Sequence, residues 1–195
     1  MESKKIEKYL IEVDYDTDPD CPRSWDNLGT MICFHNRYKL GDKHNYTHDN
    51  YNGWNEMKKD IIKTENVGVI LPLYLYDHSG ITMNTTGFSC GWDSGQVGFI
   101  FISKDKILEE YGGKIVTKKL KEKVTKHLVD EVKTYDKFIR GDVYGYTIYE
   151  MIKCDLGHEH KEVLDSCWGF YCERECMEEA ESIVREYICE YETLS

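Results

Sequence analysis

Proline is scarce in this sequence, with 3 residues among 195, and no long apolar run is present. The most apolar stretch, residues 67–76, is about half the length of a membrane span. The first eight residues, MESKKIEK, carry charges where a secretory signal needs an apolar segment. Together with an apolar share of 41%, these absences disfavour a disordered, membrane-spanning or exported chain. We therefore expect a packed globular protein in the cytoplasm.

Positive charge is also in short supply. The chain has 25 Lys and Arg against 36 Asp and Glu, which gives a formal charge of −11. Phosphate binding depends on Lys and Arg that release counterions, so this balance disfavours a free-standing nucleic-acid binder. Proteins with basic surfaces are easier partners for an acidic chain, although acidity also simply keeps a protein soluble. Both interpretations fit the composition.

The sequence lacks a phosphate-binding loop as well. Its glycine-rich segment, GWDSGQVG at 91–98, has no Lys followed by Ser or Thr, and it precedes a strand instead of a helix. Nucleotide hydrolysis is therefore disfavoured.

The 8 cysteines would suggest a disulfide framework in a secreted chain, but in a reducing compartment we expect reduced thiols packed as small apolar groups.

Hydrophobic periodicity predicts an α+β fold. Helices are expected at 54–64, from Ser103 to Tyr111, from about 117 to 140 and over 173–191. Strands are expected at 6–15, 28–35, 67–76, 81–84, 97–102, 143–152 and 163–170. The clearest element is the helix from Thr117 to Arg140, because its apolar side chains recur every three or four residues and Gly141 follows its end.

These elements predict one domain over residues 1–195. We expect a mainly antiparallel sheet, with the long helix of about 117–140 and the C-terminal helix packed against it. Leu128 lies in the middle of the apolar stripe of the long helix and should face the sheet. The polar stretch from 36 to 53 has no periodicity, which is typical of a long surface loop that carries function.

A thiol, an imidazole and a carboxylate occur close together between residues 76 and 98. A cysteine nucleophile needs a base and an orienting carboxylate, and Cys90, His78 and Asp93 are of the right types. The alternative, which we favour, is that glycines and serines form turns here while Asp93 caps one turn and Cys90 is a buried apolar group. The three residues are catalytic candidates, and no catalytic residue is assigned.

Two further groups of residues are of types that bind metals. Cys172 and Cys176 would share one helical face near Cys167, His158 and His160, but this spacing is not a recognised zinc pattern. We therefore expect no metal and no cofactor.

In the region of the long loop, six residues could bind a transition metal or a polar ligand, with an ordinary hydrated loop as the alternative. They are Cys33, His35, Asp42, His44, His48 and Asp49.

Several longer motifs resemble those of one family. They are WDNLGTM at 25–31, DHSGI at 77–81, WDSGQVGFI at 92–100 and DSCWGFY at 165–171. The chain resembles, over nearly its whole length, a family of small hypothetical proteins of tailed phages and prophages. This resemblance implies a phage origin and the cytoplasm of a host cell. It carries over no catalytic residue, since no activity is attached to that family.

Small acidic phage proteins are often antagonists of host defence. We therefore expect the protein to bind a host protein or nucleoprotein complex, as an anti-CRISPR or anti-restriction protein would, without binding nucleic acid or a membrane directly. The expected binding residues are Trp25, Asp26, Arg37, His44, Trp92, Gln96, Glu175, Glu178, Glu179 and Glu186. One alternative is an enzyme, or a protein that binds a small ligand or nucleotide, with a pocket around His78, Cys90 and Asp93. Another is a structural or morphogenetic phage accessory. The sequence leaves the oligomeric state open.

Overall fold

A computed structural model describes residues 2–194 and the side chains of residues 2–190. Its contacts divide the chain into two compact units. Unit 1 is Met1–Asp20 with Gly141–Ser195, and unit 2 is Cys21–Arg140. The predicted α+β class is confirmed, because helices and antiparallel strands both occur. The assignment of one domain over residues 1–195 stays a prediction.

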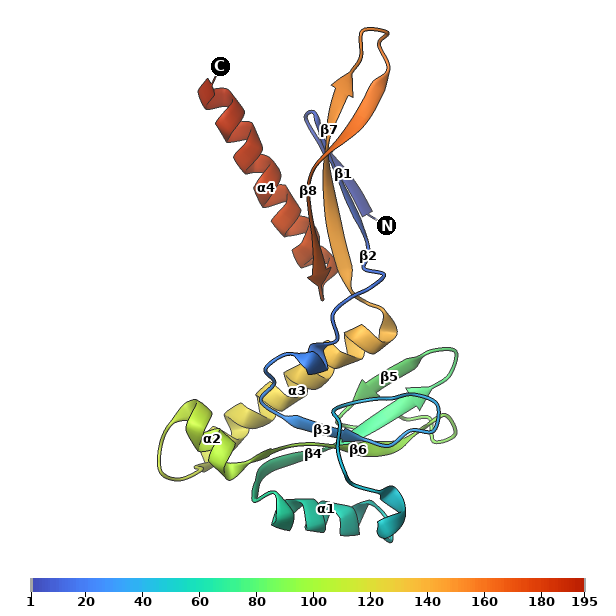
Figure 1. The fold of residues 1–195 in the computed structure, drawn as a ribbon, viewed down its shortest axis with the longest axis vertical. Coiled ribbons are helices and arrows are strands. Elements are labelled where there is room, and N and C mark those ends of the chain that lie inside the picture. Colours follow the sequence, from blue (N-terminus) through green and yellow to red (C-terminus); the bar gives the residue numbers. More distant parts are fainter. Residues whose placement is uncertain (1, 195) are drawn as a thin grey trace. The chain divides into compact units, whose positions relative to one another are not determined.

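Unit 1 contains a four-stranded antiparallel sheet in the order β1-β2-β7-β8 (Figure 1). The strands are β1 (Glu2–Ile6), β2 (Tyr9–Tyr15), β7 (Tyr144–Lys153) and β8 (Glu159–Phe170). The sequence predicted one strand over 6–15, but the chain turns back at Glu7, whose φ is +53°, and forms a hairpin. Periodicity missed β1 because most of its side chains are exposed polar groups.

Helix α4 (Glu173–Leu194) covers one face of the unit 1 sheet. Alternate side chains of β2, including Ile11 and Val13, are buried on this face. They pack with Met177, Ala180 and Val184 of α4 in one apolar cluster. The helix is thus held by a single apolar stripe, and its opposite side is left to solvent.

Unit 2 contains a second four-stranded antiparallel sheet in the order β3-β6-β4-β5. These strands are β3 (Thr30–Cys33), β4 (Val67–Asp77), β5 (Ile81–Asn84) and β6 (Ser94–Ser103). Strands β3 and β6 approach closely at Gly98, where a Cβ atom would lie 1.9 Å from the carbonyl oxygen of Ile32. Only glycine fits at this position.

Helices cover both faces of the unit 2 sheet (Figure 1). On one face, α1 (Trp54–Thr64) packs Met57 and Ile61 against Phe99 and Phe101. On the other face, α2 (Lys104–Tyr111) and α3 (Lys118–Arg140) pack against Ile100, Ile102 and their neighbours. Successive side chains of β6 therefore enter opposite cores, as the period of a strand requires.

The predicted orientation of α3 is confirmed. Leu128 is fully buried in the cluster that joins α3 to the sheet. Asp136 of α3 also accepts hydrogen bonds from the Met83 amide and the Thr82 hydroxyl of β5, at 2.6 and 2.7 Å. The difference from expectation is that two sheets form, with α3 on one and α4 on the other. Periodicity identifies strands but does not say which strands pair.

Among residues 2–194, no helix has both the length and the apolar character that a bilayer crossing requires.

Candidate functional site

The long loop of unit 2 surrounds a surface hollow of about 900 Å³. Fourteen residues between Cys33 and Trp54 line it, and no other part of the described chain contributes. The six metal- or ligand-binding candidates of the loop region are all among them: Cys33, His35, Asp42, His44, His48 and Asp49. The loop itself is mostly irregular, as predicted, with one short 3₁₀ turn at His48–Asn50. We refer to this feature as the histidine hollow.

Aromatic rings form much of the wall of the histidine hollow. The Phe34 ring lies 4.9 Å from the His44 ring and 5.7 Å from the His48 ring, measured between centroids. His48 in turn meets the Trp54 ring edge to face at 4.8 Å. On another side, the His35 and Tyr38 rings stack at 5.1 Å. The hollow can therefore contact a planar group through both ring faces and ring edges.

Hydrogen bonds fix the orientation of two of the imidazoles. The Nδ1 atom of His35 accepts from the backbone amides of Arg37 and Tyr38, each at 3.2 Å, while its Nε2 lies 3.6 Å from the Asp77 carboxylate. The Nε2 atom of His44 donates to the Cys33 carbonyl at 3.1 Å. The Nδ1 atom of His44 is buried and makes no hydrogen bond.

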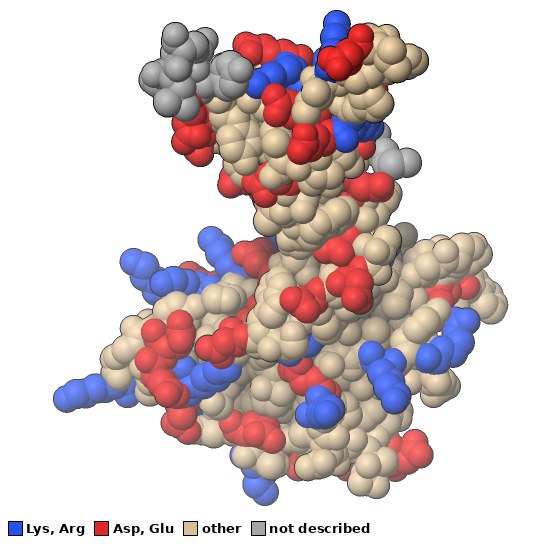
Figure 2. Space-filling view, turned by 45° about the horizontal axis from the view of Figure 1, so that its top comes forward, with Lys and Arg blue, Asp and Glu red and all other residues tan. Residues whose placement is uncertain are grey.

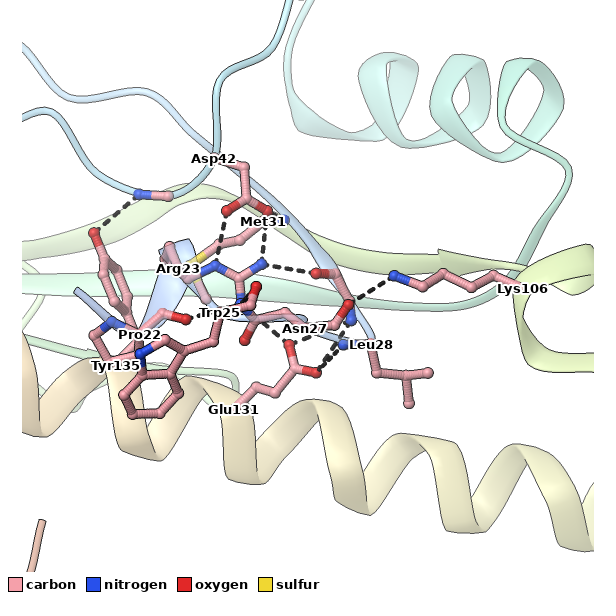
Figure 3. Close-up of polar contacts among 12 residues, drawn as sticks. Pro22, Arg23, Trp25, Asn27, Leu28, Met31, Asp42, Lys106, Glu131 and Tyr135 are labelled. Carbon is pink, nitrogen blue, oxygen red and sulfur yellow. Dashed lines mark hydrogen bonds and ion pairs between the residues drawn. The ribbon is translucent and has the colours of Figure 1, made fainter. Parts of the chain in front are cut away.

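A largely buried ion-pair network holds the loop in place (Figure 3). Arg23 forms a bidentate pair with Asp42, at 2.8 and 2.6 Å, and also contacts Glu131 of α3 at 3.1 Å. The Arg23 side chain is 5% exposed and that of Glu131 is 9% exposed. Every charge in this network has a partner, as a buried charge requires.

Backbone groups complete the network. Glu131 accepts from the Leu28 amide at 2.7 Å, and Asp42 accepts from the Met31 amide at 2.7 Å. The Tyr135 hydroxyl accepts from the Gly41 amide at 3.0 Å (Figure 3). Gly41 has a φ of +70°, and a Cβ atom there would lie 2.6 Å from the Met31 carbonyl oxygen, so this anchor needs glycine. The histidine hollow is thus built on a rigid support.

The same network sets several pKa values. Burial alone would lower the pKa of Arg23, but its hydrogen bonds and charge pairs with Asp42 and Glu131 outweigh burial and raise it. Burial, with the nearby Asp42 charge, raises the pKa of the Cys33 thiol to about 12. A thiol with this pKa stays protonated near neutral pH, so Cys33 contributes a small apolar surface to the hollow and not a nucleophile.

The structure brings the three catalytic candidates near one another, with the carboxylate in the middle. Asp93 lies 3.3 Å from the Nδ1 atom of His78 and 3.9 Å from the sulfur of Cys90. A cysteine nucleophile instead needs the imidazole beside the sulfur. The His78 side chain is 62% exposed, and a hollow of about 310 Å³ is lined by Asp93 but by neither His78 nor Cys90. This arrangement matches a hydrogen-bonded turn better than a catalytic triad.

The weak zinc candidates are not brought together. His160 lies near the start of β8, whereas Cys172 and Cys176 follow its end. At about 3.3 Å per residue, the ten steps from His160 to Phe170 alone span about 33 Å. Cys176 is fully buried, which raises the pKa of its thiol to about 12. Within the described part of the chain, no three His, Cys, Asp or Glu side chains converge as a metal site requires.

The other predicted binding residues of unit 2 do not form one surface, although Arg37 and Trp92 both line the hollow of about 310 Å³ beside Asp93. Trp92 is 98% exposed and Trp25 is 48% exposed. Asp26 is exposed, and Arg37 pairs with Asp77. The Gln96 side chain donates to the Gly98 carbonyl at 3.2 Å, within its own strand. Of the predicted binding residues in this unit, only His44 lines the histidine hollow.

The predicted acidic residues of unit 1 lie together on the solvent side of α4. Glu175, Glu178, Glu179 and Glu186 are all exposed, opposite the stripe that packs on the sheet. Glu178 pairs with Arg174 at 3.1 Å, and both side chains of this pair are largely exposed. The other three have no ion-pair partner among the described residues.

Sequence reasoning missed Arg23 and Glu131, although one signal was present. Glu131 follows Leu128 by three residues and Val124 by seven, so it falls on the buried stripe of α3. A charged residue on an apolar stripe indicates a buried partner of opposite charge. Lys39, Lys43 and Trp54, which line the histidine hollow, were not predicted as binding residues from the sequence.

Comparisons with protein-family models, with curated proteins and with solved structures give no match for this chain. The resemblance to a phage protein family therefore stays a prediction.

Proposed function

We propose that the protein acts by binding a partner protein with a basic surface, through the acidic face of unit 1. The observation that carries this proposal is the uneven distribution of charge between the two units. Unit 1 has 21 Asp and Glu against 7 Lys and Arg, a formal charge of −14. Unit 2 has 15 against 18, a formal charge of +3.

This segregation favours recognition over solubility alone. Charge that serves only solubility can be spread over the whole surface with both signs mixed. Here carboxylates occur over both units, whereas most of the Lys and Arg that would balance them lie in unit 2 (Figure 2). A dense field of one sign steers and selects a partner of the opposite sign, at the expense of self-repulsion within the fold.

Helix α4 is the best candidate for the contact surface. Its outward carboxylates recur at positions 175, 178, 179 and 186, so they lie along one side of a regular helix. Because Glu175, Glu179 and Glu186 lack ion-pair partners among the described residues, their charges remain available to a basic partner.

The finer assignment is that the partner is a host nucleic-acid-binding protein. Proteins that bind nucleic acids carry clustered Lys and Arg on their binding surfaces, and such surfaces complement an acidic face. The motif resemblance to phage proteins supports the same assignment by association, and points to antagonism of an anti-CRISPR or anti-restriction kind. The arrangement of Cys90, Asp93 and His78 gives no comparable support to the enzyme alternative.

The test is affinity capture from bacterial lysate with the wild-type protein and two matched variants. One variant replaces Glu175, Glu178, Glu179 and Glu186 by Gln. The control replaces four exposed acids of unit 2, Glu109, Glu110, Glu122 and Asp130, by the corresponding amides, so the net charge is the same. Circular dichroism checks that each variant keeps its helices.

We expect the wild type and the control to capture the same partner and the α4 variant to lose it. Added duplex DNA should release the partner because it competes for the same basic surface. Raised salt should also release it because salt screens the charges on both proteins. Equal capture by both variants, or a partner that DNA does not displace, would contradict the proposal.

A further inference from the structure

We propose that the histidine hollow of unit 2 binds a small organic anion that carries a planar ring, which is the chemistry of a free mononucleotide. This site is separate from the acidic face of α4 and does not depend on the function proposed for it. With about 900 Å³, the hollow is within the range of small-molecule sites, and all of its lining residues in the described structure lie within 33–54.

The charges that face the hollow favour an anion. Lys39 and Lys43 line it, are exposed and have no ion-pair partner among residues 2–190. Of the two carboxylates in the wall, Asp42 is already neutralised by its bidentate pair with Arg23. Asp49 is the remaining acid, and it lies 3.9 Å from His48. Two ammonium groups therefore outnumber the one available carboxylate, and an anionic ligand supplies the missing negative charge.

The rings of the hollow favour a planar group on that anion. The His48 and Trp54 rings contact each other edge to face, and Phe34 packs beside both at 5.7 and 6.0 Å. His48 is only half-buried, so its ring is accessible from the hollow. Stacking or edge contact with a planar base is the interaction that such rings provide.

A neighbouring hollow of about 500 Å³ is a weaker candidate. It shares Lys43 and His44 with the first, but its acidic group Glu65 already accepts from the Tyr46 hydroxyl at 2.7 Å. Its remaining lining is mostly polar side chains of the loop and Thr64. The histidine hollow, in contrast, combines unpaired cations with a wall of rings, and its loop is held by Arg23, Gly41 and Asp42 before any ligand arrives.

The experiment is isothermal titration calorimetry of the full chain with three related ligands: adenosine monophosphate, adenosine and ribose 5-phosphate. Adenosine lacks the anion, and ribose 5-phosphate lacks the planar ring. The titrations are repeated with a Lys39→Gln, Lys43→Gln variant. The matched control is Lys126→Gln, Lys133→Gln, which removes two exposed lysines of α3 that do not line the hollow.

We expect adenosine monophosphate to bind more tightly than either fragment. The Lys39→Gln, Lys43→Gln variant should bind it about tenfold more weakly or worse, because the loss of even one charge-assisted hydrogen bond costs about a factor of ten in affinity. The control should bind as the wild type does. Four results would overturn the proposal: no binding of adenosine monophosphate at millimolar concentration, adenosine binding as tightly, ribose 5-phosphate binding as tightly, or equal affinity of the hollow variant and the control.

Discussion

Arg23 and Glu131 form an ion pair at 3.1 Å although 108 residues separate them in the sequence. Arg23 also holds Asp42, so one guanidinium joins the start of unit 2, the long loop and α3. The position of the histidine hollow depends on this junction. Loss of the cation would leave two carboxylates close together without compensation.

Replacement Arg23→Met should lower the free energy of unfolding by about 3–5 kcal/mol, since removing one member of a buried ion pair leaves the other charge buried and unpaired. Denaturant unfolding followed by circular dichroism measures this change. The control Arg174→Met breaks the exposed pair with Glu178 and should cost at most about 1 kcal/mol. Equal effects of the two replacements would mean that the Arg23 network contributes no more than a surface pair.

Replacement Leu128→Ala should lower the free energy of unfolding by about 2–5 kcal/mol, through lost burial and the cavity that remains. The residue is fully buried between α3 and the sheet. Ile115→Ala is a suitable control in the same unit, because Ile115 is 72% exposed and should change the stability little. A stability change within error of zero for Leu128→Ala would contradict the packing of α3.

Thiol reactivity should follow burial. None of the 8 cysteines, all within the described residues, forms a disulfide, so titration of the denatured protein without reductant should find all of them. In the folded protein, exposed Cys167 and Cys189 should react first with an aromatic disulfide reagent. Cys33 and Cys176 should react only on unfolding, because burial raises the pKa of each thiol to about 12 and the thiolate is the reactive form. Rapid labelling of Cys33 at pH 8, read by mass spectrometry, would contradict this order.

The stability of unit 1 should fall in acid partly through Glu181. This carboxylate accepts hydrogen bonds from Lys4 at 2.5 Å and Arg185 at 3.0 Å, and these contacts, led by Lys4, lower its pKa. A lowered pKa in the folded state gives stability that is present above the unfolded pKa of about 4.3 and is lost as the pH falls through the folded pKa.

Glu181→Gln should therefore destabilise the protein at pH 7 and make no difference at a pH below the folded pKa. Urea unfolding of the variant and the wild type at several pH values measures the gap between them. Glu178→Gln is the matched control, because its pair with Arg174 is exposed and should contribute little. A gap that stays constant from pH 7 into strong acid would show that Glu181 acts through packing and not through its charge.

Local pattern was enough to predict much of the secondary structure. The helix predicted at 54–64 has the bounds of α1, and the strand predicted at 81–84 has the bounds of β5. Ser103 caps α2 as expected, with its hydroxyl accepting from the Lys106 amide at 3.2 Å. These features depend on residues within one or two turns of each other, such as apolar spacing, a capping hydroxyl or a glycine past a helix end.

Pairing between distant segments was decided only in the tertiary structure. Strand β2 pairs with β7, more than a hundred residues later, and this pairing places the N-terminal and C-terminal segments in one sheet.

The histidine hollow was also decided by the tertiary structure. Its polar residues could be named as candidates from the sequence, because they are close together in the loop. The shape of the hollow and its excess of positive charge could not be predicted from the sequence. The charge depends on Arg23 neutralising Asp42, and the shape depends on the contact between the Trp54 and His48 rings. Local sequence determines which conformations a segment prefers. Charge neutralisation and strand pairing instead depend on contacts between residues that are distant in the sequence, and these contacts form only in the folded chain.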